Sequence, residues 1–249
     1  LHLPEVNKVL SSPIFVNQDV VNALFGDLKK VRQEMERPER VKGSVAKWAA
    51  VTEVGEIKTE NVLGFLKGSD KADELIVITA HFDHIGLAFG QGDQIYNGAD
   101  DNGSGTVAVM QLAKAFAAAK KEGKGPRRSI LFMTVSAEEW GLFGSEYYTD
   151  HPVFPLENTV TNLNIDMIGR RDDAHTTKTD YVYVIGSDKL STELHQISES
   201  SNNTYTKLSF DYTYNDEHHP SNLYQRSDHW NFARRGIPII FYFDGIHQD

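Results

Sequence analysis

Leu75-Ile76-Val77-Ile78-Thr79 is the stretch that decides the fold, because apolar and β-branched side chains follow one another there without a charged interruption. A strand with one solvated face alternates apolar and polar residues, whereas a strand buried on both faces reads as a continuous apolar run. The run ends in Ala80-His81-Phe82-Asp83-His84, where imidazole and carboxylate groups appear. The stretch therefore predicts a central strand whose carboxyl end carries polar chemistry.

Further strands and helices alternate along the rest of the chain. Strands are predicted at 129–135, 161–168, 181–185 and 237–243, and helices at 104–121, 145–149, about 189–200 and 228–234. Alternation of buried strands with helices is typical of helices that cover both faces of a mostly parallel sheet. The predicted fold class is α/β, a three-layer αβα sandwich around a mainly parallel mixed sheet.

The beginning of the chain has a different character. Residues 1–43 contain two early prolines and one amphipathic stretch that ends near Pro38. We expect a peripheral segment there, the remnant of an inserted or preceding domain. Residues 44–249 are expected to form the main domain, beginning with β-like stretches at 45–57 and 61–67.

Composition and charge exclude several classes of partner. The 249 residues carry a net charge of −10 and no basic tract, which argues against nucleic acid or an anionic membrane surface. The longest apolar run, Ile237–Phe243, is far shorter than the ~20 residues of a membrane-spanning helix. Cysteine is absent, so disulfide and thiolate chemistry are excluded. The oligomeric state is not readable from the sequence.

A glycine-rich loop precedes the helix at 104–121. It reads Asn97-Gly98-Ala99-Asp100-Asp101-Asn102-Gly103-Ser104-Gly105 and presents two adjacent carboxylates at a helix start. Acidic groups at that position are mildly favourable by themselves, by ~0.3–1 kcal/mol, so a capped helix would explain the loop alone.

Polar residues at successive strand ends favour a metal site over this simpler explanation. His81 and Asp83 follow one strand, Glu138 and Glu139 another, and Asp166 a third. The carboxyl ends of parallel strands meet at one edge of a sheet, where ligands bind. Clustered carboxylates repel one another, and Zn²⁺, which accepts imidazole nitrogen and carboxylate oxygen, relieves that repulsion. Two ions would need a bridging carboxylate, for which Asp100 is the candidate.

Four motifs in this order resemble peptidase family M28, the co-catalytic zinc aminopeptidases. They are His81-x-Asp83, the loop at 98–105, Ala137-Glu138-Glu139-x-Gly141 and Asn164-Ile165-Asp166-Met167. The resemblance extends over roughly residues 60–245 and implies two Zn²⁺ ions in one active site. It implies that one ion is held by His81, Asp100 and Asp166, and that Asp100 and Glu139 belong to the other. It also implies a cis peptide bond after the bridging aspartate, here between Asp100 and Asp101.

The resemblance also implies roles for the remaining site residues. Asp83 would hydrogen-bond His81 and fix its tautomer. Glu138 would be the general base, since adjacent side chains diverge and only one of the two glutamates can face the metal. Tyr224 is the candidate for binding the oxyanion, with Tyr212, Tyr214 and Tyr242 as rivals. The implied substrate is a peptide with a free α-amino group.

Other readings stay open at this stage. A glutaminyl-cyclase-like acyl transferase and a non-catalytic receptor-like ectodomain are the alternatives, and carboxypeptidase specificity would need a basic clamp from Arg170, Arg171 or Arg226. Relatives with a protease-associated domain insert are often secreted or periplasmic, and this is the only basis for expecting the same here.

The family's last zinc ligand is a histidine just after the final core strand, in a segment resembling Tyr-His-x-Pro. The only histidine after Ile237–Phe243 is His247, about three residues early. A displacement of ~3 Å per residue is too large for bonds of ~2.0–2.1 Å. We therefore expect the natural chain to continue, and a protein ending at Asp249 to hold the second zinc weakly.

Overall fold

The computed structural model describes residues 58–87 and 92–247. The expected peripheral segment 1–43 and the β-like stretch 45–57 lie outside the described residues. In chain order the elements are β1 (Val62–Leu66), β2 (Lys71–His81), η2 (Ala99–Ser104), α3 (Gly105–Lys121), β3 (Arg128–Val135), α4 (Phe143–Asp150), β4 (Thr159–Ile165), β5 (Tyr181–Ile185), α5 (Thr192–Ser201), β6 (Ser209–Asp211), α6 (His229–Ala233) and β7 (Ile239–Phe243).

The described strands form one sheet in the order β1-β3-β2-β4-β7-β5-β6. The pairs β2–β3, β2–β4, β4–β7 and β5–β6 are parallel, whereas β1–β3 and β5–β7 are antiparallel. The mainly parallel mixed sheet predicted from the sequence is therefore confirmed. The strand β6 is the element that the sequence reading missed, because only three residues pair at this edge of the sheet.

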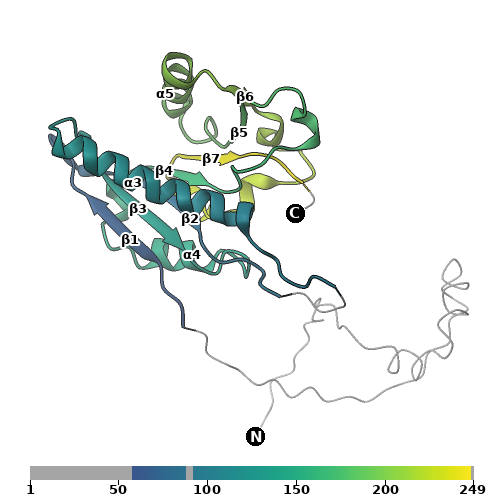
Figure 1. Cartoon of the computed structure of the whole chain (residues 1–249). Helices are drawn as coiled ribbons and strands as arrows, with labels where there is room; N and C mark the ends of the chain where they lie inside the picture. Colours follow the sequence, from purple (N-terminus) through teal and green to yellow (C-terminus); the bar gives the residue numbers. More distant parts are fainter. Residues whose placement is uncertain (1–57, 88–91, 248–249) are drawn as a thin grey trace, which may run out of the picture. The chain divides into compact units, whose positions relative to one another are not determined.

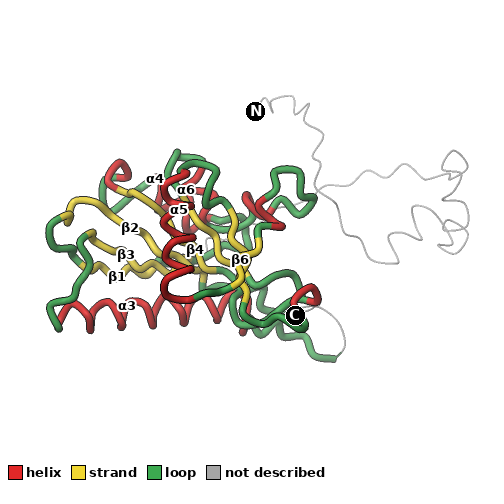
Figure 2. The backbone as a smooth tube through the Cα atoms, turned by 90° about the horizontal axis from the view of Figure 1, so that it is seen from above, coloured by secondary structure: helices red, strands yellow, loops and turns green. Residues whose placement is uncertain are grey.

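Helices cover both faces of the sheet. Figure 2 shows α3 on one side of the strands and α4 with α6 on the other. Residues of β2, β3 and β4 pack against Val109 of α3 on the first face, and residues of β2, β3 and β7 pack against Tyr148 of α4 and Phe232 of α6 on the second. The three-layer αβα arrangement is confirmed, with the central strands buried on both faces (Figure 1).

The strand β2 is the centre of this arrangement. Val77 and Ala80 are fully buried, in agreement with the continuous apolar run that predicted a strand covered on both sides. Because β2 pairs with both β3 and β4, the carboxyl ends of three strands lie next to one another. No described helix is long and apolar enough to cross a membrane.

His229, at the start of α6, is the most deeply buried imidazole of this core. Its ring stacks on Phe241 with 4.6 Å between ring centroids, and its Nε2 lies 2.8 Å from the carbonyl oxygen of Tyr224. The Nδ1 atom has no hydrogen-bond partner among the described residues. Burial lowers the pKa of His229 to about 3, so the folded protein holds this ring neutral.

His229 is therefore expected to make stability fall in acid. Its folded pKa lies below the unfolded value of 6.5, so its contribution is complete above pH 6.5 and is lost as the pH falls. The loss is about 1.4 kcal/mol per pH unit between pH 6 and 4. Urea unfolding across this range should show a shallower pH slope for His229→Gln than for the unsubstituted protein. Equal slopes would contradict the assignment.

Candidate metal centre

Three neighbouring strand ends and one loop bring the predicted site residues together. His81 ends β2, Glu138 and Glu139 follow β3, and Asp166 follows β4. The loop η2 contributes Asp101 from the side of α3. His81 and Asp166 are 85 positions apart in the sequence, yet their Nε2 and Oδ1 atoms lie 3.3 Å apart.

The His81 imidazole is completely buried and directed into this cluster. Its Nε2 lies 3.1 Å from Oδ1 of Asp101 and 3.3 Å from Oδ1 of Asp166. Its Nδ1 lies 3.0 Å from the backbone carbonyl oxygen of Asp83 and donates to it when it carries the proton. That hydrogen bond fixes the tautomer in which Nε2 keeps its lone pair for a metal ion.

The Asp83 carboxylate acts differently from the sequence expectation. It lies 3.7 Å from His81 Nδ1, too far for a hydrogen bond, and the backbone carbonyl of the same residue takes that role instead. The carboxylate oxygens accept hydrogen bonds from the backbone N–H groups of Glu138, at 3.1 Å, and Glu139, at 3.3 Å. Asp83 thus holds the turn that presents both glutamates.

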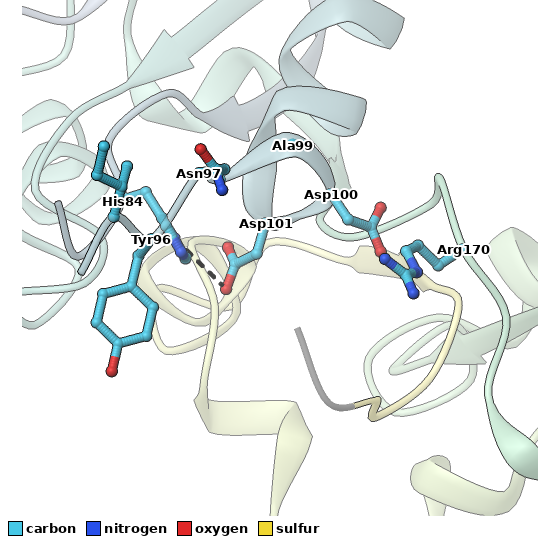
Figure 3. Close-up of a pocket in the computed structure, with 9 residues that line it drawn as sticks. His84, Tyr96, Asn97, Ala99, Asp100, Asp101 and Arg170 are labelled. Carbon is cyan, nitrogen blue, oxygen red and sulfur yellow. Dashed lines mark ion pairs between the residues drawn. The ribbon is translucent and has the colours of Figure 1, made fainter. Parts of the chain in front are cut away.

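Asp101 occupies the place that the sequence reading gave to Asp100. One oxygen of Asp101 faces His81, and the other lies 3.9 Å from Nδ1 of His84. His84 Nδ1 is in turn 2.7 Å from Oε1 of Glu139. Figure 3 shows Asp101 turned towards His84, while Asp100 turns the other way, towards Arg170.

Asp100 is therefore not part of the cluster around His81, contrary to the sequence expectation that it bridges two ions. The carboxylate of Asp100 accepts hydrogen bonds from the backbone of Gly169, at 2.6 Å, and from Nε2 of His247, at 2.8 Å. The backbone at Asp101 is extended (φ −96°, ψ 95°), so the two neighbouring side chains point to different sides. The cis peptide bond lies between Asp101 and Asn102, one residue later than expected.

Asn102 and Gly105 hold Asp101 in position. The Asn102 side chain donates to the carbonyl of Ile165 at 3.0 Å and accepts from the N–H of Gly105 at 2.9 Å. A Cβ atom at Gly105 would lie 2.3 Å from Oδ1 of Asn102 and 2.5 Å from the Ile165 carbonyl. Only glycine allows this close approach, which fastens the loop to the end of β4.

A hydrogen-bond chain that the sequence reading missed orients Asp166. Ser227 Oγ donates to Oδ2 of Asp166 at 2.6 Å and accepts from Asn164 Nδ2 at 2.9 Å. The Asn164 amide oxygen accepts in turn from Thr79 Oγ1 at 2.6 Å. The signals for this chain were polar Thr79 at the end of the apolar run of β2 and polar Asn164 on β4, one of the central strands.

The electrostatics of the cluster favour a bound cation. Burial, reinforced by the charge of Asp166, raises the pKa of Glu138 to about 9. Burial disfavours the charged form of His81, but the surrounding carboxylates, Asp101 first, outweigh it and raise the pKa of His81. Both shifts arise because several acidic groups share a space with little water. A divalent cation would offset this excess of negative charge.

Two sets of donor atoms could each hold such an ion. His81, Glu138 and Asp166 form one set, and His84, Asp101 and Glu139 form the other; within each set the ligand atoms lie within 4.8 Å of one another. Nitrogen and carboxylate oxygen are the donors that zinc accepts, so the residues present fit that metal. The sequence reading missed His84, although it follows His81 by only three positions.

Tyr224 lies outside the cluster around His81. Its ring packs on Trp230, and Lys189 Nζ lies 5.1 Å above it. Within the described residues its hydroxyl makes no hydrogen bond to the cluster, and its role in binding an oxyanion stays a prediction. Of its rivals, the Tyr212 hydroxyl bonds Glu199, the Tyr214 ring packs on Tyr183, and the partly buried Tyr242 packs against the core beside α3.

A cavity of about 390 Å³ opens beside Asp101. His84, Tyr96 and Asp101 line one part of it, and Asp100 and Arg170 line another (Figure 3). The cavity thus places one guanidinium and one aromatic ring beside the second set of donors.

Comparisons with known proteins identify a matching family and several relatives. The model of a family described as "Peptidase family M28" matches residues 61–249. Aminopeptidase YwaD of Bacillus subtilis is 29% identical over 155 residues, which cover 61% of this chain and 30% of YwaD. A probable glutamate carboxypeptidase of Arabidopsis thaliana, AMP1, is 34% identical over 110 residues, or 44% of this chain and 14% of AMP1.

A solved structure shares the fold as well. The zinc aminopeptidase BSAP of Bacillus subtilis has a TM-score of 0.58 and 25% identity, with 75% of this chain and 42% of BSAP covered. The chain therefore spans less than half of the length of each of these relatives.

Proposed function

Because the chain belongs to peptidase family M28, we propose that it hydrolyses the N-terminal bond of peptides that carry a free α-amino group. In this proposal zinc is the cofactor, and two ions are bound. His81, Asp166 and Asp101 would hold one ion, and Glu139, His84 and Asp101 would hold the second.

The position of Asp101 is the observation that carries this proposal. Its two carboxylate oxygens face two separate sets of donors, one around His81 and one around His84. A carboxylate that bridges two ions ~3.5–4 Å apart must present its oxygens in this way. His81 is held in the tautomer that leaves Nε2 available, which supports the same assignment.

Glu138 is the general base in this proposal. Bound zinc supplies a Lewis acid that polarises the scissile carbonyl and lowers the pKa of water. Glu138 takes a proton from the attacking water and returns it to the departing amine. Its backbone N–H is held by Asp83, and its carboxylate reaches the donors of His81 and Asp166, so it stands beside the place where water would react.

The charge of the cluster is consistent with a substrate that presents a free N-terminal amino group. The described site gathers carboxylates from Asp101, Glu138, Glu139 and Asp166 against two imidazoles. Two zinc ions would balance the charge of four ionised carboxylates, so the loaded cluster would carry no net positive charge to repel the ammonium of a peptide N-terminus.

Carboxypeptidase activity is a second candidate, favoured by one observation. Arg170 lines the cavity beside Asp101, where its guanidinium could meet a substrate carboxylate. The similarity to the probable glutamate carboxypeptidase AMP1 supports testing this candidate. Arg171 and Arg226, the other two arginines considered from the sequence, do not line this cavity.

A panel of substrates distinguishes aminopeptidase activity from carboxypeptidase activity and from acyl transfer. Aminoacyl-p-nitroanilides, their N-acetylated counterparts, N-terminal glutaminyl peptides and N-acylated dipeptides are compared with and without added zinc. The aminopeptidase proposal predicts zinc-dependent hydrolysis of the free-amine substrates and less than a hundredth of that rate with the acetylated ones. Release of the C-terminal residue from N-acylated dipeptides would favour a carboxypeptidase, and ammonia release from glutaminyl peptides would favour an acyl transferase.

Removing metal is expected to lower the thermal stability of the chain. Ions that bind only the folded state stabilise it by about 2.7 kcal/mol each at a concentration 100 times Kd. Two ions then correspond to a fall in Tm of roughly 10–20 °C when a strong chelator is added. Differential scanning calorimetry with chelator, and again after zinc is restored, measures this change. A Tm that does not respond to the chelator would count against the cluster as a metal centre.

A further inference from the structure

A third set of metal-binding side chains lies on the other side of the loop that carries Asp101, apart from the two sets around His81 and His84. Asp100, Asp244 and His247 bring three donor atoms within 4.8 Å of one another. Asp100 precedes Asp101, whereas Asp244 and His247 follow β7. The group therefore joins two loops that are 147 positions apart in the sequence.

One carboxylate oxygen of Asp100 and one of Asp244 already accept a hydrogen bond from a backbone N–H group. Asp100 Oδ1 accepts from the N–H of Gly169, and Asp244 Oδ2 accepts from the N–H of Arg170, both at 2.6 Å. Consecutive backbone amides thus fix the two carboxylates side by side. Their remaining oxygens, Asp100 Oδ2 and Asp244 Oδ1, are left to face His247 Nε2, at 2.8 and 3.9 Å respectively.

One of these oxygens is unsatisfied. Asp244 is 5% exposed, and its Oδ1 has no hydrogen-bond partner among the described residues. A buried carboxylate oxygen without a partner is costly, and two buried carboxylates side by side add repulsion. Arg170 lines the cavity next to Asp100 and offsets one of the two charges at most.

We propose that Asp100, Asp244 and His247 form a further divalent-cation site, separate from the cluster around His81. A tetrahedral zinc ion with bonds of ~2.0–2.2 Å separates its ligands by about 3.3–3.5 Å, between the two distances measured to His247 Nε2. Two carboxylates and one imidazole suit zinc. The ion would fasten the loop after β7 to the loop that positions Asp101.

Zinc content of the full chain tests this proposal. Asp244→Asn and His247→Gln are compared with the unsubstituted protein by elemental analysis after dialysis in zinc-containing buffer. Each variant is expected to hold one zinc ion fewer per chain and to show a smaller rise in Tm when zinc is added. Asp70→Asn is the matched control, because that carboxylate is exposed and paired with Arg127.

The possible results test this metal site independently of the proposed peptidase function. An unchanged zinc count in His247→Gln overturns the proposal, and the contact between His247 and Asp100 is then a hydrogen bond without a shared ion. If Asp244→Asn does not fold, the zinc count of His247→Gln decides the test alone. Glutamine at position 247 keeps an N–H that can donate to Asp100, so this variant is expected to fold. His81→Ala removes zinc from the other cluster and leaves this ion bound, so a failure of the peptidase proposal does not affect this count.

Discussion

Glu138→Gln is expected to bind zinc as the unsubstituted protein does and to lose at least a thousandfold in kcat. Glutamine has nearly the same shape as glutamate but cannot accept and return a proton. General acid–base catalysis contributes 10²–10⁴-fold, and here one group would serve both the attacking water and the departing amine. The backbone hydrogen bond from Glu138 to Asp83 is untouched by this change, so the turn should keep its shape.

Two measurements decide this prediction. Elemental analysis gives the zinc content, and steady-state kinetics with an aminoacyl-p-nitroanilide gives kcat and KM separately. Glu122→Gln, at the exposed end of α3, is the control for loss of one carboxylate, and its kinetics should not change. A zinc-loaded Glu138→Gln protein with ordinary turnover would exclude Glu138 as the base.

Asp101→Asn is expected to cause the largest loss of metal of any single substitution at the cluster around His81. Its two oxygens serve both sets of donors, so one substitution weakens both ions. Asparagine offers only one oxygen and no charge, and we expect at least a hundredfold weaker zinc binding at each position and no detectable peptide hydrolysis.

Asp100→Asn is the matched comparison for Asp101→Asn, because the two adjacent carboxylates face different groups. Asparagine there keeps an oxygen for the Gly169 N–H, and the residue does not face His81. Competition with a chromophoric zinc chelator should therefore show a much smaller effect on the two ions proposed at the cluster around His81 than Asp101→Asn does. The opposite ranking would restore Asp100 as the bridging residue.

The architecture was largely readable from the sequence because the central strands are buried on both faces. The runs at 75–79 and 129–135 predicted β2 and β3 in the correct order, and β5 was predicted with its observed bounds. The buried status of Val77, Leu131 and Met133 explains why. The edge strand β6 was not found, since three half-buried residues carry no periodic signal.

The sequence predicted which strand ends meet in the cluster around His81, but not that Asp101 and His84 face it. Motif spacing brought His81, Glu138, Glu139 and Asp166 together, but a run of two aspartates does not reveal which one faces the cluster. That choice depends on the backbone angles of Asp101 and on the close contact between Asn102 and Gly105. The proximity of His84 to Glu139 depends on tertiary packing between residues 55 positions apart.

The strand order of the sheet also governs how the chain must fold. His81 and Asp166 come together only when β2 pairs with β4, which joins segments 85 positions apart, and such distant parallel pairing makes for slow folding. Until those two strands meet, His81 and Asp166 are not close enough to share an ion. If zinc binds His81 and Asp166 only once β2 and β4 have paired, it should retard unfolding while leaving the rate of refolding unchanged.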